Sequence, residues 1–190
     1  LVNGKRRHKG SIIAFDGGGI ADGAQSPDIS VIPAIALKQV EVLRDGASAQ
    51  YGSDAVAGVI NFVLKDDADG GQFELKMGQF SEGDGEQVTL SGNVGLGLGD
   101  DGFANFSFEV NQQDPTSRST QRSDAQAIID EGNTAVANPA QVWGSPEISD
   151  DFKLFLNTGI ELANGGDAYM FGNWSEKTVQ GGFYFRNPNT

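Results

Sequence analysis

Beyond residue 70, apolar and polar residues alternate one by one along the chain. The first such run places Phe73, Leu75 and Met77 between polar neighbours. Successive side chains of a β-strand point to opposite faces, so this pattern predicts strands with one apolar and one polar face. A fifth run carries aromatic residues on both faces. The predicted strands cover residues 72–77, 87–98, 105–111 and 152–162, with the fifth near 168–176.

The connections between these runs alternate in length. Asp100-Asp101-Gly102 and residues 164–167 are short hairpin signals. Residues 112–151 form a long insertion, with a helix predicted at 124–131 and ended by Gly132. Tilted strands of about ten residues, with short turns on one side and longer loops on the other, are typical of outer-membrane β-barrels. A soluble or surface-attached β-sandwich that binds a ligand is the alternative, although its strands are usually about five or six residues long.

The N-terminal part has a different pattern. Residues 37–44 and 58–65 predict two strands, and a single helical turn is expected at 47–51. Small residues dominate positions 46–58, which predicts close backbone packing. Residues 66–71 are acidic and contain glycine, as a linker would. We therefore expect one domain over residues 1–66 and a second over 71–190.

Composition excludes several kinds of protein. The formal net charge of −13 argues against a nucleic-acid partner, which would need clustered Lys and Arg. The absence of cysteine excludes disulfides and thiolate metal sites. No apolar run reaches the length of about 18 residues that a membrane-spanning helix requires. The abrupt start at Leu1 and end at Thr190 suggest part of a longer protein.

Catalytic and cofactor motifs are weak. Residues 97–102 fit the dinucleotide pattern G-x-G-x-x-G, but a strand rather than a helix follows, and two aspartates would repel phosphate. Asp66, Asp67 and Asp69 do not have the spacing of a calcium loop. His8 is the only histidine, and no serine shows a nucleophile pattern. We expect no enzyme, cofactor or metal site, although a glycosidase carboxylate pair stays open among 26 acidic residues.

One motif is much more specific. It comprises Val40-Glu41-Val42-Leu43-Arg44, Tyr51-Gly52 and Gly58-Val59-Ile60-Asn61, in that order. The series resembles the end of the plug domain of TonB-dependent outer-membrane receptors. Many members have Gly-Pro where this chain has Asp45-Gly46, and either pair can reverse the chain. The resemblance implies an α+β plug joined to an all-β antiparallel transmembrane β-barrel, of which this chain would hold the first five or six strands.

The resemblance also implies a function and partners. Such receptors take up a scarce nutrient, such as an iron chelate, cobalamin or an oligosaccharide, across the bacterial outer membrane. The expected partners are TonB with the inner-membrane ExbB-ExbD energy complex, outer-membrane lipid and lipopolysaccharide, and the small-molecule or oligosaccharide ligand.

Charged residues of the motif contact the inner barrel wall in the resembling family. Glu41 and Arg44 project to opposite faces of an extended strand, so we expect each to meet a partner outside that strand. Asn61 lies within an apolar strand and is expected to hydrogen-bond to the turn around Tyr51-Gly52, because an unpaired amide there would be unfavourable. The predicted set for plug–barrel contact and gating is Glu41, Arg44, Asp45, Tyr51, Gly52 and Asn61.

A second set concerns the ligand. Residues 1–37 contain a short strand signal near the N-terminus, followed by a glycine-rich loop. The loop between that strand and Pro33 lies where plug domains of this family present apical loops to the incoming ligand. The residues of that loop that could contact ligand are Arg7, His8, Lys9, Phe15 and Asp16.

Overall fold

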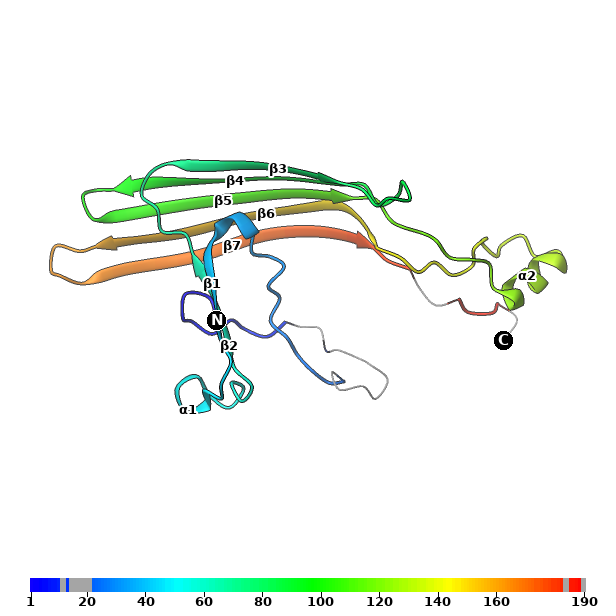
Figure 1. The fold of residues 1–190 in the computed structure, drawn as a ribbon, viewed down its shortest axis with the longest axis horizontal. Helices are drawn as coiled ribbons and strands as arrows, with labels where there is room; N and C mark the ends of the chain where they lie inside the picture. The colour runs from blue at the N-terminus through cyan, green and yellow to red at the C-terminus, as the bar shows by residue number, and fades with distance from the viewer. Residues whose placement is uncertain (11–12, 14–21, 183–184, 189–190) are drawn as a thin grey trace. The chain divides into compact units, whose positions relative to one another are not determined.

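The computed structural model describes residues 1–10, 13, 22–182 and 185–188. Its first part contains the 3₁₀ helix η1 (Ala34–Ala36), strand β1 (Leu37–Leu43), helix α1 (Ser48–Tyr51) and strand β2 (Val59–Leu64). The strands of the second part are β3 (Gly71–Gly78), β4 (Gln87–Leu98), β5 (Gly102–Gln113), β6 (Glu147–Glu161) and β7 (Asp167–Gln180), with helix α2 (Ser123–Asp130) between β5 and β6 (Figure 1). The strands predicted beyond residue 36 and both predicted helices are present, and β3, β5, β6 and β7 are longer than predicted. The short strand predicted near the N-terminus is wrong for the described residues, where Val2 forms only isolated bridges with Lys5 and Phe62.

Strands β1 and β2 form an antiparallel pair in which Glu41 lies opposite Asn61. The small-residue stretch connects them through α1. Gly58 has a φ of +143°, and a Cβ at this position would lie 2.3 Å from the Leu43 carbonyl oxygen. Only glycine allows this approach, so the run of small residues lets the chain close tightly on itself.

The five long strands form one sheet, which we call the long sheet. Its strand order is β3-β4-β5-β6-β7, so each strand pairs with its neighbour in the chain. Strands running in alternate directions make the sheet antiparallel (Figure 1). Among the described residues, β3 and β7 are its two edges, and the sheet is not closed on itself.

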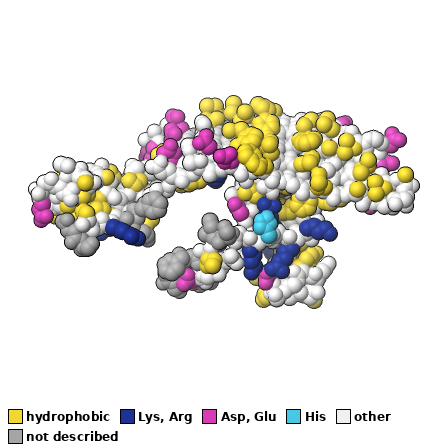
Figure 2. All heavy atoms as spheres, turned by 180° about the vertical axis from the view of Figure 1, so that it is seen from behind, with side chains coloured by type: hydrophobic (Ala, Val, Ile, Leu, Met, Phe, Trp, Pro, Cys, Tyr) yellow, Lys and Arg dark blue, Asp and Glu magenta, His cyan; other side chains and the backbone are white. Residues whose placement is uncertain are grey.

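Burial in the long sheet is inverted. Proteins in water normally bury apolar side chains and expose polar ones, whereas hydrophobic side chains spread over this sheet in Figure 2. One face of the sheet, the outward face, carries exposed apolar side chains, and the other, the inward face, carries buried polar ones. Exposed apolar residues include Phe73, Leu75, Met77, Val94, Leu96, Phe106, Val110, Leu154, Met170 and Trp174. Buried polar residues include Ser91, Asn93, Asn105, Ser107, Asn111, Lys153 and Asn157.

The described chain separates into two compact units. The first comprises Leu1–Phe73, Ser91–Glu109 and Lys153–Ser175. The second comprises Glu74–Leu90, Val110–Phe152 and the residues from Glu176 onward. No helix in the described ranges is long and apolar enough to cross a lipid bilayer.

The first unit holds the main hydrophobic cluster. Val2, Ile32, Ala36 and Leu64 come from residues 1–65, which we call the N-terminal segment, and Phe155 comes from β6. The segment therefore has little core of its own and completes it with a side chain from the long sheet.

In the second unit, hydrogen bonds join the beginning and the end of the long connection between β5 and β6. Ser145 N donates to Thr116 Oγ1 at 2.8 Å, and Trp143 N donates to Ser119 Oγ at 2.7 Å. Arg118 binds both carboxylate oxygens of Asp84 at 3.1 and 2.6 Å, which ties this connection to the turn between β3 and β4. The guanidinium beside Asp84 lowers the pKa of that carboxyl below its ordinary value of 3.8.

Candidate functional site

The clearest site in the first unit is where the inward face of the long sheet binds the linker that follows β2. We define this linker as residues 66–70. Asn157 Nδ2 on β6 donates to the Lys65 carbonyl at 2.9 Å, and Asn105 Nδ2 on β5 donates to the Asp67 carbonyl at 3.3 Å. The backbone N–H of Gly95 on β4 donates to the Gly70 carbonyl at 3.0 Å. Three neighbouring strands thus each hold the backbone at or beside the linker.

Gly95 makes this approach possible. A Cβ at position 95 would lie 2.3 Å from the Asp67 carbonyl oxygen and 2.9 Å from that of Asp69. Real Cβ atoms do not approach backbone this closely, so any side chain here would push the linker away from β4.

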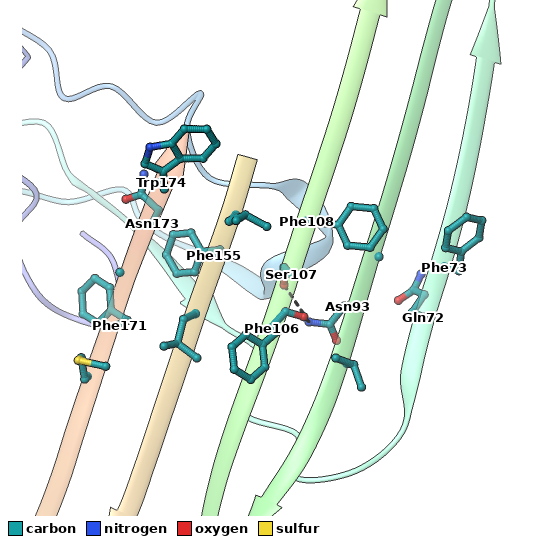
Figure 3. A pocket seen from close by; sticks show the side chains of 16 residues that line it. Gln72, Phe73, Asn93, Phe106, Ser107, Phe108, Phe155, Phe171, Asn173 and Trp174 are labelled. Atoms are coloured by element: carbon teal, nitrogen blue, oxygen red, sulfur yellow. Dashed lines mark hydrogen bonds between the residues drawn. The ribbon is translucent and has the colours of Figure 1, made fainter. Parts of the chain in front are cut away.

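The amide of Asn105 is held by its own network. Asn93 Nδ2 donates to Asn105 Oδ1 and, at 2.8 Å, to Ser107 Oγ (Figure 3). All three residues are buried. Because buried polar groups are unfavourable unless they are hydrogen-bonded, this network fixes the orientation of Asn105 toward the linker.

Phe155 provides the apolar part of the contact. It is 3% exposed and packs with Val2, Leu64 and Ala36. Its neighbours on the inward face of β6, Lys153 and Asn157, are polar. In the sequence, Phe155 is an aromatic residue that interrupts the polar positions of an alternating strand, and this signal could have marked the contact in advance.

Polar bonds surround this apolar contact. Asn3 donates to the Tyr169 hydroxyl of β7, and its Oδ1 accepts from Leu64 N at 2.7 Å. Arg7 donates to the Asp28 carbonyl at 3.2 Å and to Asn173 Oδ1 of β7 at 3.3 Å. The N-terminal segment is therefore bound to the long sheet mainly through neutral amide and hydroxyl groups.

The structure brings together two of the residues predicted for plug–barrel contact. Asn61 Nδ2 donates to Glu41 Oε2 at 2.8 Å, across the β1–β2 pair. Asn61 Oδ1 accepts from Gly4 N at 2.9 Å. The prediction that Asn61 bonds to the turn around Tyr51-Gly52 is therefore wrong. The turn at residues 3–4 lies beside the middle of β2, where Asn61 is, whereas Tyr51 and Gly52 lie beyond its first residue.

Glu41 and Asn61 face a cavity of about 400 Å³, together with Asp66, Asn157 and Tyr169. Asn157 Oδ1 is buried and has no hydrogen-bond partner among the described residues. A buried carbonyl oxygen without a partner is unfavourable by about 1–3 kcal/mol. The polar part of the contact between the segment and the inward face therefore leaves one buried hydrogen-bond acceptor, Asn157 Oδ1, without a partner among the described residues.

Arg44, Asp45, Tyr51 and Gly52 lie away from the linker contact. Arg44 and Asp45 are exposed just beyond the end of β1, and Tyr51 ends α1 with 36% of its surface exposed. Gly52 has a φ of +92° and follows α1 as its C-cap. Contacts of these four residues with a barrel wall stay a prediction.

The candidate ligand residues are placed in part. Arg7 and Lys9 line a cavity of about 440 Å³ with Arg6, Tyr51 and Asp54, and Arg6 pairs with Asp54. His8 is exposed. Phe15 and Asp16 lie outside the described residues.

Comparison with known proteins identifies the N-terminal segment. The family described as "TonB-dependent Receptor Plug Domain" matches residues 1–59. Residues 1–59 of this chain are thus similar to the plug domain of TonB-dependent receptors. The family is one of receptors and transporters rather than enzymes. The predicted fold class is confirmed: a plug domain is joined to an antiparallel sheet that is open among the described residues.

One curated relative is the "Vitamin B12 transporter BtuB" of Photobacterium profundum. It is 32% identical over 89 residues, which cover 47% of this chain and 14% of that protein. The chain thus matches only a small part of the relative's length. No solved structure matches the chain.

The plug match ends at Val59, which is the first residue of β2. The backbone groups bound by Gly95, Asn105 and Asn157 follow β2 and lie beyond that match. The linker contact therefore lies in the segment that follows the matched plug region, and not in that region itself.

Proposed function

We propose that this chain is part of a receptor for active uptake of a scarce nutrient across the bacterial outer membrane. Residues 1–66 would be the end of the plug domain, and residues 71–190 would be the first strands of the barrel. The observation that carries the proposal is the inverted burial of the long sheet, with apolar side chains outward and polar side chains inward.

Energetics supports a membrane around the outward face. Leaving one large apolar side chain in water rather than burying it forfeits about 1.5–3 kcal/mol. Phe73 and Met77 are 68% and 75% exposed, and the apolar face extends from β3 to β7. In a membrane, the hydrocarbon chains of the lipid would cover this face, so the free energy of burying these side chains would not be lost.

A soluble β-sandwich would instead bury the apolar face against a second sheet. The two-stranded sheet of β1 and β2 belongs to the N-terminal segment, which lies against the inward, polar face through Asn105 and Asn157. This arrangement favours a plug inside a barrel over a sandwich.

The linker contact suits a plug that must rearrange. Each neutral hydrogen bond contributes only about 0.5–1.5 kcal/mol net. Ligand binding near Arg7 and Lys9, followed by work from TonB and the ExbB-ExbD complex, would shift the N-terminal segment on this contact. The ligand is an iron chelate, cobalamin or an oligosaccharide, and the printed name of the relative makes cobalamin one compound to test.

Two measurements test the proposal. Membrane fractionation should recover the whole receptor in the outer membrane, released only by detergent. Deletion of its gene should abolish energy-dependent uptake of one of the three ligand classes, and the unmodified gene should restore it. Recovery of the protein in the soluble fraction, or unchanged uptake of all three classes, would count against the proposal.

Charge reversal at the motif tests the predicted gating contact. Arg44→Glu should reduce uptake or plug retention if Arg44 meets the barrel wall. Lys5→Glu, an exposed basic residue outside the motif, is a control for the change in charge. Equal uptake and plug retention by the Arg44 variant and the unmodified receptor would remove Arg44 from the gating set.

A further inference from the structure

A groove of about 590 Å³ crosses the outward face of the long sheet within the first unit (Figure 3). Its lining comes from all five strands. By the alternation of the strands, the side chains that open into it from the outward face are almost all apolar. They include Phe73, Val94, Phe106, Leu154, Met170 and Trp174.

Two glycines shape this groove. A Cβ on Gly92 would lie 2.4 Å from the ring of Phe108, so that ring lies directly over the β4 backbone. Gly172 on β7 has no atom within 4 Å of the position of its missing Cβ. The gap at Gly172 separates Met170 from Trp174, both of which are more than half exposed.

The groove offers little to a polar ligand. Asn93 and Ser107 contribute to its wall, but their side chains lie on the inward face and are hydrogen-bonded to each other at 2.8 Å. A sugar or a metal chelate would leave its polar groups without partners here, which is unfavourable. Flexible hydrocarbon is the chemistry that matches the lining.

We propose that this groove binds one acyl chain of a phosphatidylethanolamine molecule in the periplasmic leaflet. The inference rests on the proposed function, because it requires the outward face to contact lipid. The groove is continuous with that face, and it differs from the rest of the face in being recessed at Gly172, where no atom lies within 4 Å of the missing Cβ.

The position of the groove indicates the leaflet. Gly172 follows the first residue of β7, Asp167, by five positions. At about 3.3 Å per residue and a tilt of about 45°, it lies roughly 12 Å from the tight turn. Outer-membrane barrels place short turns on the periplasmic side, and half of the hydrocarbon layer is about 15 Å. The groove therefore lies at acyl-chain depth in the periplasmic half.

Charge at the tight turns indicates the headgroup. The turns carry Asp100, Asp101 and Asp167, all exposed. Neither the turn between β4 and β5 nor that between β6 and β7 contains a Lys or Arg. These carboxylates attract the ammonium of an ethanolamine headgroup and repel anionic lipid.

The test uses the whole receptor, reconstituted in vesicles of phosphatidylethanolamine and phosphatidylglycerol and extracted in mild detergent. Native mass spectrometry then counts retained lipids. We expect one retained phosphatidylethanolamine on the unmodified receptor. Gly172→Leu fills the gap and should reduce that retention about tenfold, as expected when roughly two methylene groups lose their contacts.

Ala168→Leu is the matched control, because position 168 lies on the same strand and face but outside the groove. It should retain the lipid. Equal retention by the Gly172 variant and the unmodified receptor would overturn the proposal. Preferential retention of phosphatidylglycerol, or of lipopolysaccharide when the receptor is extracted from native outer membrane, would do the same.

Insertion separates this inference from the proposed function. A receptor that inserts into vesicles but retains no lipid contradicts the groove alone. A receptor that does not insert contradicts the proposed function as well.

Discussion

The N-terminal segment and the long sheet follow opposite rules of burial, although they share a contact. The segment buries Val2, Ile32 and Leu64, as a protein in water does. The long sheet exposes residues such as Phe73 and buries residues such as Asn93. The difference shows that the two parts are built for different surroundings. Phe155 is the exception on the inward face of the sheet, because this buried apolar side chain packs with the core of the N-terminal segment.

The largest effect should come from removing that shared side chain. Phe155→Ala should destabilise docking of the N-terminal segment by about 3–5 kcal/mol, because it empties the centre of the hydrophobic cluster. Limited proteolysis of the segment in the whole receptor would measure this. Phe106→Ala, on the outward face, should leave the segment protected. Similar proteolysis of both variants would show that the two faces do not differ as described.

A charge placed on each face would test the inverted burial directly. Leu75→Arg, on the outward face of β3, should destabilise the membrane-inserted protein by about 2–4 kcal/mol near the bilayer midplane. Ser175→Arg, at an inward position of β7, should have a much smaller effect. Urea unfolding in lipid vesicles gives both values. A larger effect at Ser175 than at Leu75 would reverse the assignment of the faces.

Removing one linker bond should have an intermediate effect. Asn105→Leu deletes the donor to the Asp67 carbonyl and removes one acceptor of Asn93, at a loss of about 1–3 kcal/mol. Hydrogen exchange should increase for the backbone of residues 66–70. Asn133→Leu, in the connection after α2, is the control and should leave exchange of the linker unchanged. If the two variants exchange alike at the linker, Asn105 does not hold it.

The smallest effect concerns the connection between β5 and β6, where charged groups lie in water. The pKa of Asp84 is lowered by its hydrogen bond to Arg118, so the stabilisation is present above pH 3.8 and is lost as pH falls through the lowered pKa. The protection factors of the amides in residues 114–118, which compare the observed exchange rate with the intrinsic rate at the same pH, should therefore fall in acid. Asp84→Asn should remove most of this pH dependence. An unchanged pH profile in that variant would exclude the Arg118 pair as its cause.

The alternation of side chains was sufficient to predict the five long strands and the faces of the first four, because successive residues of a strand point to opposite faces. The faces of β7 could not be predicted in this way, since aromatic residues lie on both. The sequence also predicted the turns and α2. The contact of the linker was not predictable in this way. Asn105 and Asn157 have the same polar pattern as any residue facing water, and only their position opposite the Lys65 and Asp67 carbonyls gives them a role.

Asn61 shows the same limit from the other direction. Because Asn61 lies inside an apolar strand, its side chain was correctly expected to need a hydrogen-bond partner. Its partners are the Glu41 carboxylate on β1 and the N–H of Gly4, from a turn distant in the sequence. Local reasoning could not choose them over the Tyr51-Gly52 turn, which is nearer in the sequence. Phe155 is different, because its position out of phase with the apolar face was already visible in the sequence.

The linker contact has a consequence for the order of assembly. Its donors come from β4, β5 and β6, so the binding site for the linker exists only after these three strands have paired. The N-terminal segment is made first, yet its final position depends on strands that follow it in the chain. Contacts of such long sequence separation form slowly. The N-terminal segment therefore docks after β4, β5 and β6 have paired. These strands determine where the segment binds.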